Sequence, residues 1–313
     1  MSNLIVSTSP HIRSPRTTRS IMLDVLIALS PAAVASVIFF GLKALLMIAV
    51  CVVSAVGSEY LFNLLTKKKQ TIGDLSAAVT GLLLAFNLSA KANVWHCIVG
   101  SVFAIVIVKC AFGGLGCNFA NPAVTARIFL LISFASLGGG AAPSFASAEL
   151  VASSTPLEVI KTGEGVLPSL LDMFLGVRGG AIGETCILAL ALGYIYLVCR
   201  RVIKWETPII FIGTVFLLSL AIKGDFNLAL YELMGGGLVL GAVFMATDYV
   251  TTPINRLGKM VFALGCGLIT VLIRFFGSYA EGVSFAILIM NILSPYIEKL
   301  CSHKALGGKK NEN

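Results

Sequence analysis

Apolar residues run along most of this chain in long stretches that charged residues rarely interrupt. Stretches of about 20 such residues predict membrane-spanning helices, because a helix satisfies its own backbone groups inside lipid. We therefore predict an all-α polytopic membrane protein with about ten transmembrane helices. The expected spans are 21–41, 42–65, 72–90, 93–112, 123–135, 182–198, 207–222, 228–247, 257–276 and 283–296.

The longest interval between two spans, residues 136–181, is polar and rich in glycine, serine and alanine. It is too long for a tight connection, so we predict an external loop. Within it, residues 167–175 have the pattern of a short amphipathic helix lying at the membrane surface. Near the N-terminus, Ala33-Val-Ala35 resembles a signal-peptide cleavage site. The apolar run continues past it for a full span, which favours a retained helix.

The chain is 57% hydrophobic and 12% charged, whereas soluble domains carry about 25% charged residues. Its net charge of +8 comes from short basic clusters between apolar runs, such as Lys67-Lys-Lys69. This distribution fits membrane topology and argues against nucleic-acid binding. With the N-terminus in the cytoplasm, ten spans place most basic residues on the cytoplasmic side. The pattern therefore predicts that both termini are cytoplasmic.

The two halves of the chain share landmarks at a constant offset. Asp24 and Glu184 both precede apolar helices and lie 160 positions apart, and residues 81–87 resemble residues 241–247 at the same offset. This indicates a duplicated unit of five spans, and an odd number of spans inverts the second copy. The predicted parts are a cytoplasmic segment 1–20, a first repeat 21–135, an external loop 136–181, a second repeat 182–297 and a cytoplasmic tail 298–313.

The segment Gly179-Gly-Ala-Ile-Gly-Glu-Thr-Cys186 is a candidate functional site. Its glycines allow the backbone to turn, and the apolar run that follows places Thr185 near a helix N-terminus at the outer membrane face. Unpaired N–H groups and the helix dipole would stabilise an anion attached to Thr185. Arg178 would add a second positive charge. The alternative interpretation is that Thr185 only caps the helix.

Other polar features are less specific. Residues 119–122 predict a break in a helix, and residues 245–253 end a span in polar groups that suit a planar polar ligand. Glycines 113–116 and 235–237 allow close approach of a ligand or of another helix. Carboxylates near span ends are candidates for function. They are Asp24, Glu59, Asp74, Glu184, Glu232, Asp248 and Glu281.

Several classes of chemistry have no support in the sequence. None of the carboxylates has a neighbouring nucleophile and base, as a hydrolase would need. The eight cysteines show no spacing typical of a metal site. There is neither a dinucleotide-binding glycine motif after a strand nor a P-loop, so the chain has no nucleotide-binding fold of its own.

Four segments, in order along the chain, resemble one family. They are Ser9-Pro-His-Ile-Arg13, Asn121-Pro-Ala-Val-Thr-Ala-Arg127, Gly183-Glu-Thr185, and Phe244-Met-Ala-Thr-Asp248 with Thr252-Pro253. The chain is similar to the D subunit of the bacterial Rnf electron-transport complex. The B subunit of the sodium-pumping NADH:quinone reductase is a more distant relative.

This resemblance implies a flavoprotein subunit of an ion-translocating ferredoxin:NAD oxidoreductase in the bacterial inner membrane. FMN would be esterified through its phosphate to Thr185, with Gly183, Glu184 and Arg178 as neighbouring cofactor-binding residues. Glu184 would place a negative charge beside the phosphate. Gly179 and Ile182 stand where the family's flavinylation pattern has Asp and Ser or Thr.

The resemblance also implies partners. They are the other Rnf subunits, a flavin transferase for maturation, the lipid bilayer, and sodium or protons as the coupling ion. A second, non-covalent flavin such as riboflavin is compatible with the family, and the subunit is expected to be inactive alone. The alternative is a stand-alone channel or secondary transporter, since an inverted repeat fits that class too. Such a transporter would carry no covalent flavin.

Overall fold

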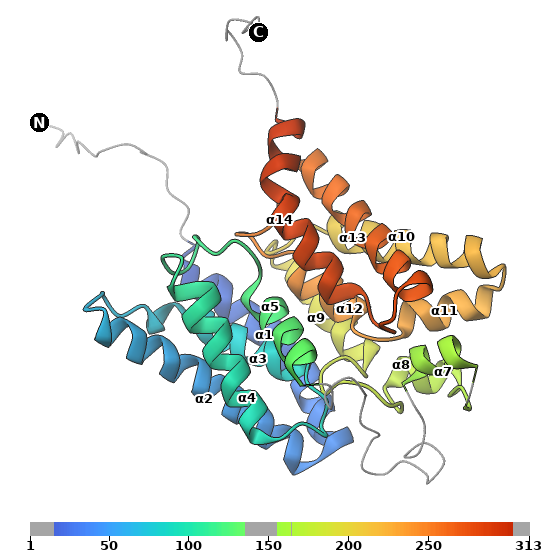
Figure 1. Cartoon of the computed structure of the whole chain (residues 1–313), viewed down its shortest axis with the longest axis horizontal. Helices are drawn as coiled ribbons and strands as arrows, with labels where there is room; N and C mark the ends of the chain where they lie inside the picture. The colour runs from blue at the N-terminus through green and yellow to red at the C-terminus, as the bar shows by residue number, and fades with distance from the viewer. Residues whose placement is uncertain (1–15, 135–154, 164, 303–313) are drawn as a thin grey trace, which may run out of the picture.

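The computed structural model describes residues 16–134, 155–163 and 165–302. Within these residues the regular structure is helical, apart from one isolated antiparallel bridge between Ser89 and Ala181 (Figure 1). The motif at residues 9–13 lies outside the described residues.

Among the described residues, five helices are long and apolar enough to cross a membrane. They are α1 (Thr18–Phe40), α2 (Leu42–Leu65), α10 (Glu206–Lys223), α13 (Arg256–Phe276) and α14 (Val283–Cys301). A sixth candidate is a bent pair in which α11 (Phe226–Met234) meets the stretch Leu238–Met245 at 61°. The chain is therefore an all-α polytopic membrane protein, as predicted.

Shorter apolar helices accompany these spans. They are α3 (Ser76–Phe86), α4 (Val94–Val102) continuing into η2 (Phe103–Cys110), α5 (Pro122–Ser133) and α9 (Ile187–Cys199). By length and composition alone they do not qualify as full spans, so the count of ten stays a prediction.

The two halves of the chain meet along α1 and α9. Figure 1 shows α2 and α4 on one side of the molecule and α10, α11 and α13 on the other. At the contact a Cβ on Gly193 of α9 would lie 2.3 Å from the carbonyl oxygen of Ala28 in α1. Only glycine permits this approach, and one hydrophobic core runs through both halves.

The prediction that the sixth span begins at residue 182 is wrong. Helix α9 begins at Ile187, because the residues before it bond to another part of the chain. The N–H of Ile182 donates to the carbonyl of Leu88 (2.9 Å), and the N–H of Gly183 donates to the carbonyl of Phe86 (3.0 Å). These long-range bonds hold the segment in turns.

Two other expected spans are interrupted. Residues 72–90 form the 3₁₀ turn η1 (Ile72–Asp74) and then α3, with Leu75 between them in the left-handed region at φ 65°. The expected span 228–247 breaks at residues 235–237 between α11 and α12 (Leu238–Leu240), and η4 (Gly241–Met245) follows. Glycines 235–237, one of the two clusters predicted to allow close approach, therefore lie at a bend.

The predicted external loop contains two short helices within its described part. α8 (Leu170–Leu175) coincides with the predicted amphipathic segment. α7 (Pro156–Thr162) was not predicted; it begins with a capping box in which Thr155 and Glu158 bond each other's backbone N–H groups. Residues 136–154 of the loop lie outside the described residues.

Helix positions in the two halves correspond at a nearly constant spacing. Helices α2, α4 and α5 start at residues 42, 94 and 122, while α10, α13 and α14 start at 206, 256 and 283. Each partner follows about 160 residues later. This spacing agrees with the offset seen in the sequence, and the inversion of the second copy stays a prediction.

Candidate functional site

The segment 179–186, named here the Thr185 segment, crosses from the second half of the chain onto the first. Its backbone bonds to Leu88 and Phe86 at the end of α3, and Ala181 bridges Ser89. A Cβ on Gly183 would lie 2.1 Å from Cγ of Phe86, so only glycine allows the segment to pass the ring. The sequence suggested that this glycine serves a turn; in the structure it permits close packing.

Thr185 itself is buried, with 1% of its surface exposed. It lies two residues before the first residue of α9, and Cys186 occupies the N-cap position without a side-chain cap bond. The alternative interpretation of Thr185 as a helix cap is therefore wrong. A Cβ on Gly180 would lie 3.1 Å from Cγ2 of Thr185, so a larger residue at position 180 would crowd this side chain.

Arg178 is also buried and holds the segment by its backbone. Its Nη2 donates to the carbonyl of Glu184 (2.7 Å), and its Nε donates to the carbonyl of Thr185 (3.2 Å). A planar guanidinium suits two converging carbonyls. Arg178 thus brings the expected positive charge to Thr185, but two of its nitrogens are committed to shaping the turn.

Glu184 has one satisfied and one unsatisfied carboxylate oxygen. Oε1 accepts from the N–H of Ala181 (2.9 Å), whereas Oε2 has no hydrogen-bond partner among the described residues. Burial raises the pKa of this carboxyl to about 7, and Glu281 adds to the shift while Arg127 and Arg178 oppose it. Glu184 lies outside the helices, in the segment before α9.

Charged residues from several helices surround the Thr185 segment. Arg127 of α5 forms an ion pair with Glu281 and donates to Oδ1 of Asn87 (2.6 Å). Arg274 of α13 pairs with Glu232 of α11 at 3.0 Å. The sequence placed Arg127 in a family motif and the glutamates near span ends, but nothing local indicated that they gather around Glu184.

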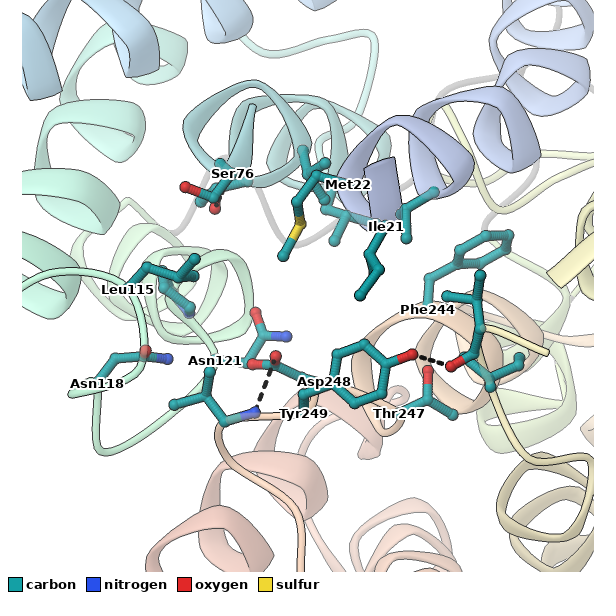
Figure 2. Close-up of a pocket in the computed structure, with 18 of the residues that line it drawn as sticks. Ile21, Met22, Ser76, Leu115, Asn118, Asn121, Phe244, Thr247, Asp248 and Tyr249 are labelled. Atoms are coloured by element: carbon teal, nitrogen blue, oxygen red, sulfur yellow. Dashed lines mark hydrogen bonds between the residues drawn. The ribbon is translucent and has the colours of Figure 1, made fainter. Parts of the chain in front are cut away.

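A second candidate site is a cavity near the other end of α9, named here the polar cavity (Figure 2). The two segments predicted to break a helix and to bind a planar ligand, 119–122 and 245–253, both contribute to it. Figure 2 shows Met22 of α1 facing Asn121 and Asp248 across the space. The structure therefore joins two motifs that the sequence analysis treated separately.

Asn121 shapes one wall of the polar cavity. Its side chain accepts from the N–H groups of Ala123 (3.1 Å) and Val124 (3.4 Å), which caps α5, and Pro122 takes the first helical position. Its amide also donates to the carbonyl of Met245 (3.4 Å). The Asn-Pro pair is thus a helix start that is bonded to the second half of the chain.

Asp248 and Tyr249 follow the end of η4, and Asp248 lies beside Asn121 on the same side of the cavity (Figure 2). Oδ1 of Asp248 accepts from the N–H of Val250 (3.4 Å), and Oδ2 accepts from the hydroxyl of Thr251 (3.2 Å). Burial raises the pKa of Asp248, and these two bonds partly offset the shift. The hydroxyl of Tyr249 donates to the carbonyl of Val202, just beyond α9.

Two other predicted carboxylates have structural partners. Glu59 of α2 forms a buried ion pair with Lys109 of η2 at 2.9 Å, and Lys109 also donates to Ser76 (2.6 Å) at the edge of the polar cavity. Asp24 of α1 pairs with Arg200 at the end of α9 (3.2 Å). The described residues contain no cluster of His, Cys, Asp and Glu that could hold a metal ion.

The chain matches the NQR2, RnfD, RnfE family over residues 5–307. It is 46% identical to the D subunit of the Na(+)-translocating ferredoxin:NAD(+) oxidoreductase complex from Acetobacterium woodii, over 98% of this chain and 96% of that protein.

Other relatives carry similar names. The chain is 39% identical to the D subunit of the proton-translocating ferredoxin:NAD(+) oxidoreductase complex of Clostridium ljungdahlii, over 97% of this chain and 96% of that protein. It is 30% identical to the D subunit of the ion-translocating oxidoreductase complex of Methanosarcina acetivorans, over the full length of both. The chain therefore belongs to the NQR2, RnfD, RnfE family.

Proposed function

We propose that this chain is the membrane flavoprotein subunit of an ion-translocating ferredoxin:NAD oxidoreductase complex. The nearly full-length similarity to subunits with that name supports the proposal, as does the all-α membrane architecture. In this function the chain relays electrons between partner subunits and is inactive alone. It resides in the bacterial inner membrane.

The first cofactor in the proposal is FMN, joined by its phosphate to Thr185. The observation that carries it is the position of Thr185: it lies between the two halves, directly before α9, on a turn that Arg178 holds by two carbonyls. The positive end of the helix and the guanidinium both favour a phosphate there. When bound, the flavin supplies the redox chemistry, and the protein residues fix its position and charge environment.

Burial of Thr185 constrains how the flavin is attached. With 1% of its surface exposed, Thr185 is closed to a flavin transferase while the Thr185 segment is packed against Phe86. Attachment therefore requires that the segment has not yet packed or is displaced. We expect the transferase to act on the chain during assembly.

The second cofactor in the proposal is a non-covalent flavin, such as riboflavin, in the polar cavity. A flavin ring has two apolar faces and a polar edge. The cavity offers apolar side chains in Met22, Leu115 and Phe244, and polar groups in Asn118 and Asp248. The Thr185 segment and this cavity lie at opposite ends of α9, which spans about 20 Å. Two flavins so placed would mark an electron route through the chain.

The coupling ion is sodium or protons. The two relatives with the highest identities quoted above carry names that differ in this ion, one sodium and one proton. Transport by the purified complex in proteoliposomes, with and without sodium, distinguishes the two.

A stand-alone transporter is the competing function, and the broken pair α11 and α12 is a feature that transporters share. Intact mass of the purified chain, read together with in-gel flavin fluorescence, separates the two. An increase equal to one FMN phosphoester supports the flavoprotein subunit. An unmodified mass, after co-expression with a flavin transferase, contradicts it.

Both termini are placed in the cytoplasm in this proposal. Cys301, the last residue of α14, is partly exposed, whereas Cys117 and Cys199 are exposed. In a Cys117→Ser, Cys199→Ser background, an impermeant thiol reagent should label Cys301 in inside-out vesicles only. Labelling of Cys301 in intact cells would contradict this topology.

A further inference from the structure

The carboxyl of Glu184 has an unpartnered oxygen close to Gly237. Glu184 is 2% exposed, and its Oε2 has no hydrogen-bond partner within the part of the chain that the structure describes. A Cβ placed on Gly237 would lie 3.0 Å from this oxygen and 3.3 Å from Nη1 of Arg127. The carboxyl and the guanidinium therefore both lie close to Gly237, where a larger residue would crowd them.

Among the described residues, neither Arg127 nor Arg178 donates a hydrogen bond to the carboxylate of Glu184. Arg127 of α5 pairs with Glu281 and donates to Asn87, and Arg178 donates to two backbone carbonyls. Farther out, Arg274 of α13 pairs with Glu232 of α11. Each of these cations is thus engaged elsewhere, and Glu281 contributes a like charge.

These surroundings allow both protonation states near neutral pH. Burial raises the pKa of Glu184 to about 7, with a further contribution from Glu281. Glu281 is partly exposed, with 28% of its side chain accessible, and its Cγ is 3.3 Å from the position that a Cβ on Gly236 would take. A second carboxylate therefore stands near Glu184 at the surface of the chain.

We propose that Glu184 is the proton-binding group of the Thr185 site, taking up one proton at Oε2 when an electron reaches the flavin and releasing it when the electron leaves. This inference rests on the proposed function. The electron comes from a reduced redox centre of a partner subunit, and the proton comes from the aqueous phase. Formation of the O–H bond removes one negative charge as the electron adds one, so the local charge is unchanged. Oxidation reverses both steps.

The physical reason is the low polarity of the site. An uncompensated charge in a buried environment interacts far more strongly than in water. A carboxyl whose pKa lies near the working pH is the group that exchanges a proton at the lowest cost. In the reduced state the neutral carboxyl does not repel the neighbouring phosphate.

Redox-difference infrared spectroscopy of the purified complex tests the proposal. The reduced-minus-oxidised spectrum should contain the C=O stretch of a protonated carboxylic acid, and the band should shift in D₂O. It should disappear in Glu184→Gln and persist in Asp24→Asn, which removes a buried carboxyl at the other end of α9. Gly237→Ala keeps the carboxyl but crowds Oε2, so it should move the band.

The outcomes distinguish the role of Glu184 from the proposed attachment of flavin to Thr185. A wild-type spectrum without the band, or a band that persists in Glu184→Gln with the flavin still on Thr185, overturns the role of Glu184 and leaves the flavin site intact. If Glu184→Gln loses its flavin, the test depends on Gly237→Ala. A carboxylic-acid band at the wild-type position in Gly237→Ala then overturns the proposed role of Glu184. Absence of any flavin on Thr185 in the wild type contradicts the proposed function itself.

Discussion

The Thr185 segment and the polar cavity differ in burial, in charge and in the space that they offer to the proposed flavins. The Thr185 segment is buried, rich in charged neighbours and packed directly against Phe86. The polar cavity is an open space in which apolar side chains of α1 face amide and carboxyl groups from two other segments. A ligand held without a covalent bond needs a cavity that is largely formed beforehand. Attachment at Thr185 instead requires that its segment is not packed against Phe86.

Removal of the Arg178 guanidinium should have the largest effect on this contrast. Arg178→Met leaves the carbonyls of Glu184 and Thr185 unpaired in a buried place, at a cost of about 2–5 kcal/mol. We expect a large drop in thermal stability and in covalent flavin, with the polar cavity unaffected. Arg178→Lys is the matched control, since it keeps the charge but cannot bridge both carbonyls. Full flavin content in Arg178→Met would contradict the role of this arginine in holding the Thr185 segment.

The pH dependence of the free energy of unfolding should differ between the wild type and Glu184→Gln. In the unfolded chain this carboxyl ionises near 4.5, whereas in the folded chain it ionises near 7. The folded state therefore binds more protons between these values, and its stability falls as pH rises from about 4.5 to about 7. The decline is at most on the order of 3 kcal/mol. Glu184→Gln should flatten it, which thermal melts across this range measure; an equal decline in the variant would exclude Glu184 as its source.

Gly183→Ala tests the close packing of the Thr185 segment. The added methyl would lie 2.1 Å from the Phe86 ring, and overpacking of this kind costs about 1–3 kcal/mol. Gly213→Ala, in α10, is the control, because a Cβ there meets nothing within 4 Å. The melting temperature and the covalent flavin fluorescence should fall in Gly183→Ala and stay unchanged in Gly213→Ala. A second change, Phe86→Leu, should restore part of the loss if the ring is the obstacle.

The polar cavity gives the smallest expected effect. Phe244→Ala removes one apolar wall of the cavity. It should lower the affinity for a non-covalent flavin about tenfold, which corresponds to about 1.4 kcal/mol of binding free energy. Flavin released by denaturation and measured by chromatography reports this directly, while the covalent flavin should be unchanged. Equal loss from both sites would mean that the two regions are not independent.

The sequence predicted the helical membrane class and the positions of most helices, because long apolar runs are a local signal. Helix α2 coincides with its predicted span, and α13 begins one residue before it. Local patterns failed where distant contacts decide. The predicted sixth span includes residues 182–186, although Gly183, Glu184 and Thr185 interrupt the apolar pattern. Bonds from this segment to Leu88 and Phe86 keep it out of α9.

The candidate sites were predicted in part. Thr185, Gly183, Glu184 and Arg178 do lie together, because they are close in sequence. Arg127 could not be joined to them from sequence, since it lies on α5 in the other half and reaches the site only through tertiary packing. The polar cavity was visible only as two separate motifs, because nothing local indicates that residues near 121 contact residues near 245.

The most direct measurement is the flavin content of Thr185→Ala, with peptide mass over residues 179–200, after co-expression with a flavin transferase. The cofactor assignment predicts that covalent fluorescence is abolished while membrane insertion is intact. Thr185→Ser, which keeps the hydroxyl, should retain a weaker signal. Alanine variants of Thr207, Thr247, Thr251 and Thr252 should keep full fluorescence. Unchanged fluorescence in Thr185→Ala, or an FMN-sized adduct on one of these other threonines, would contradict the assignment of Thr185.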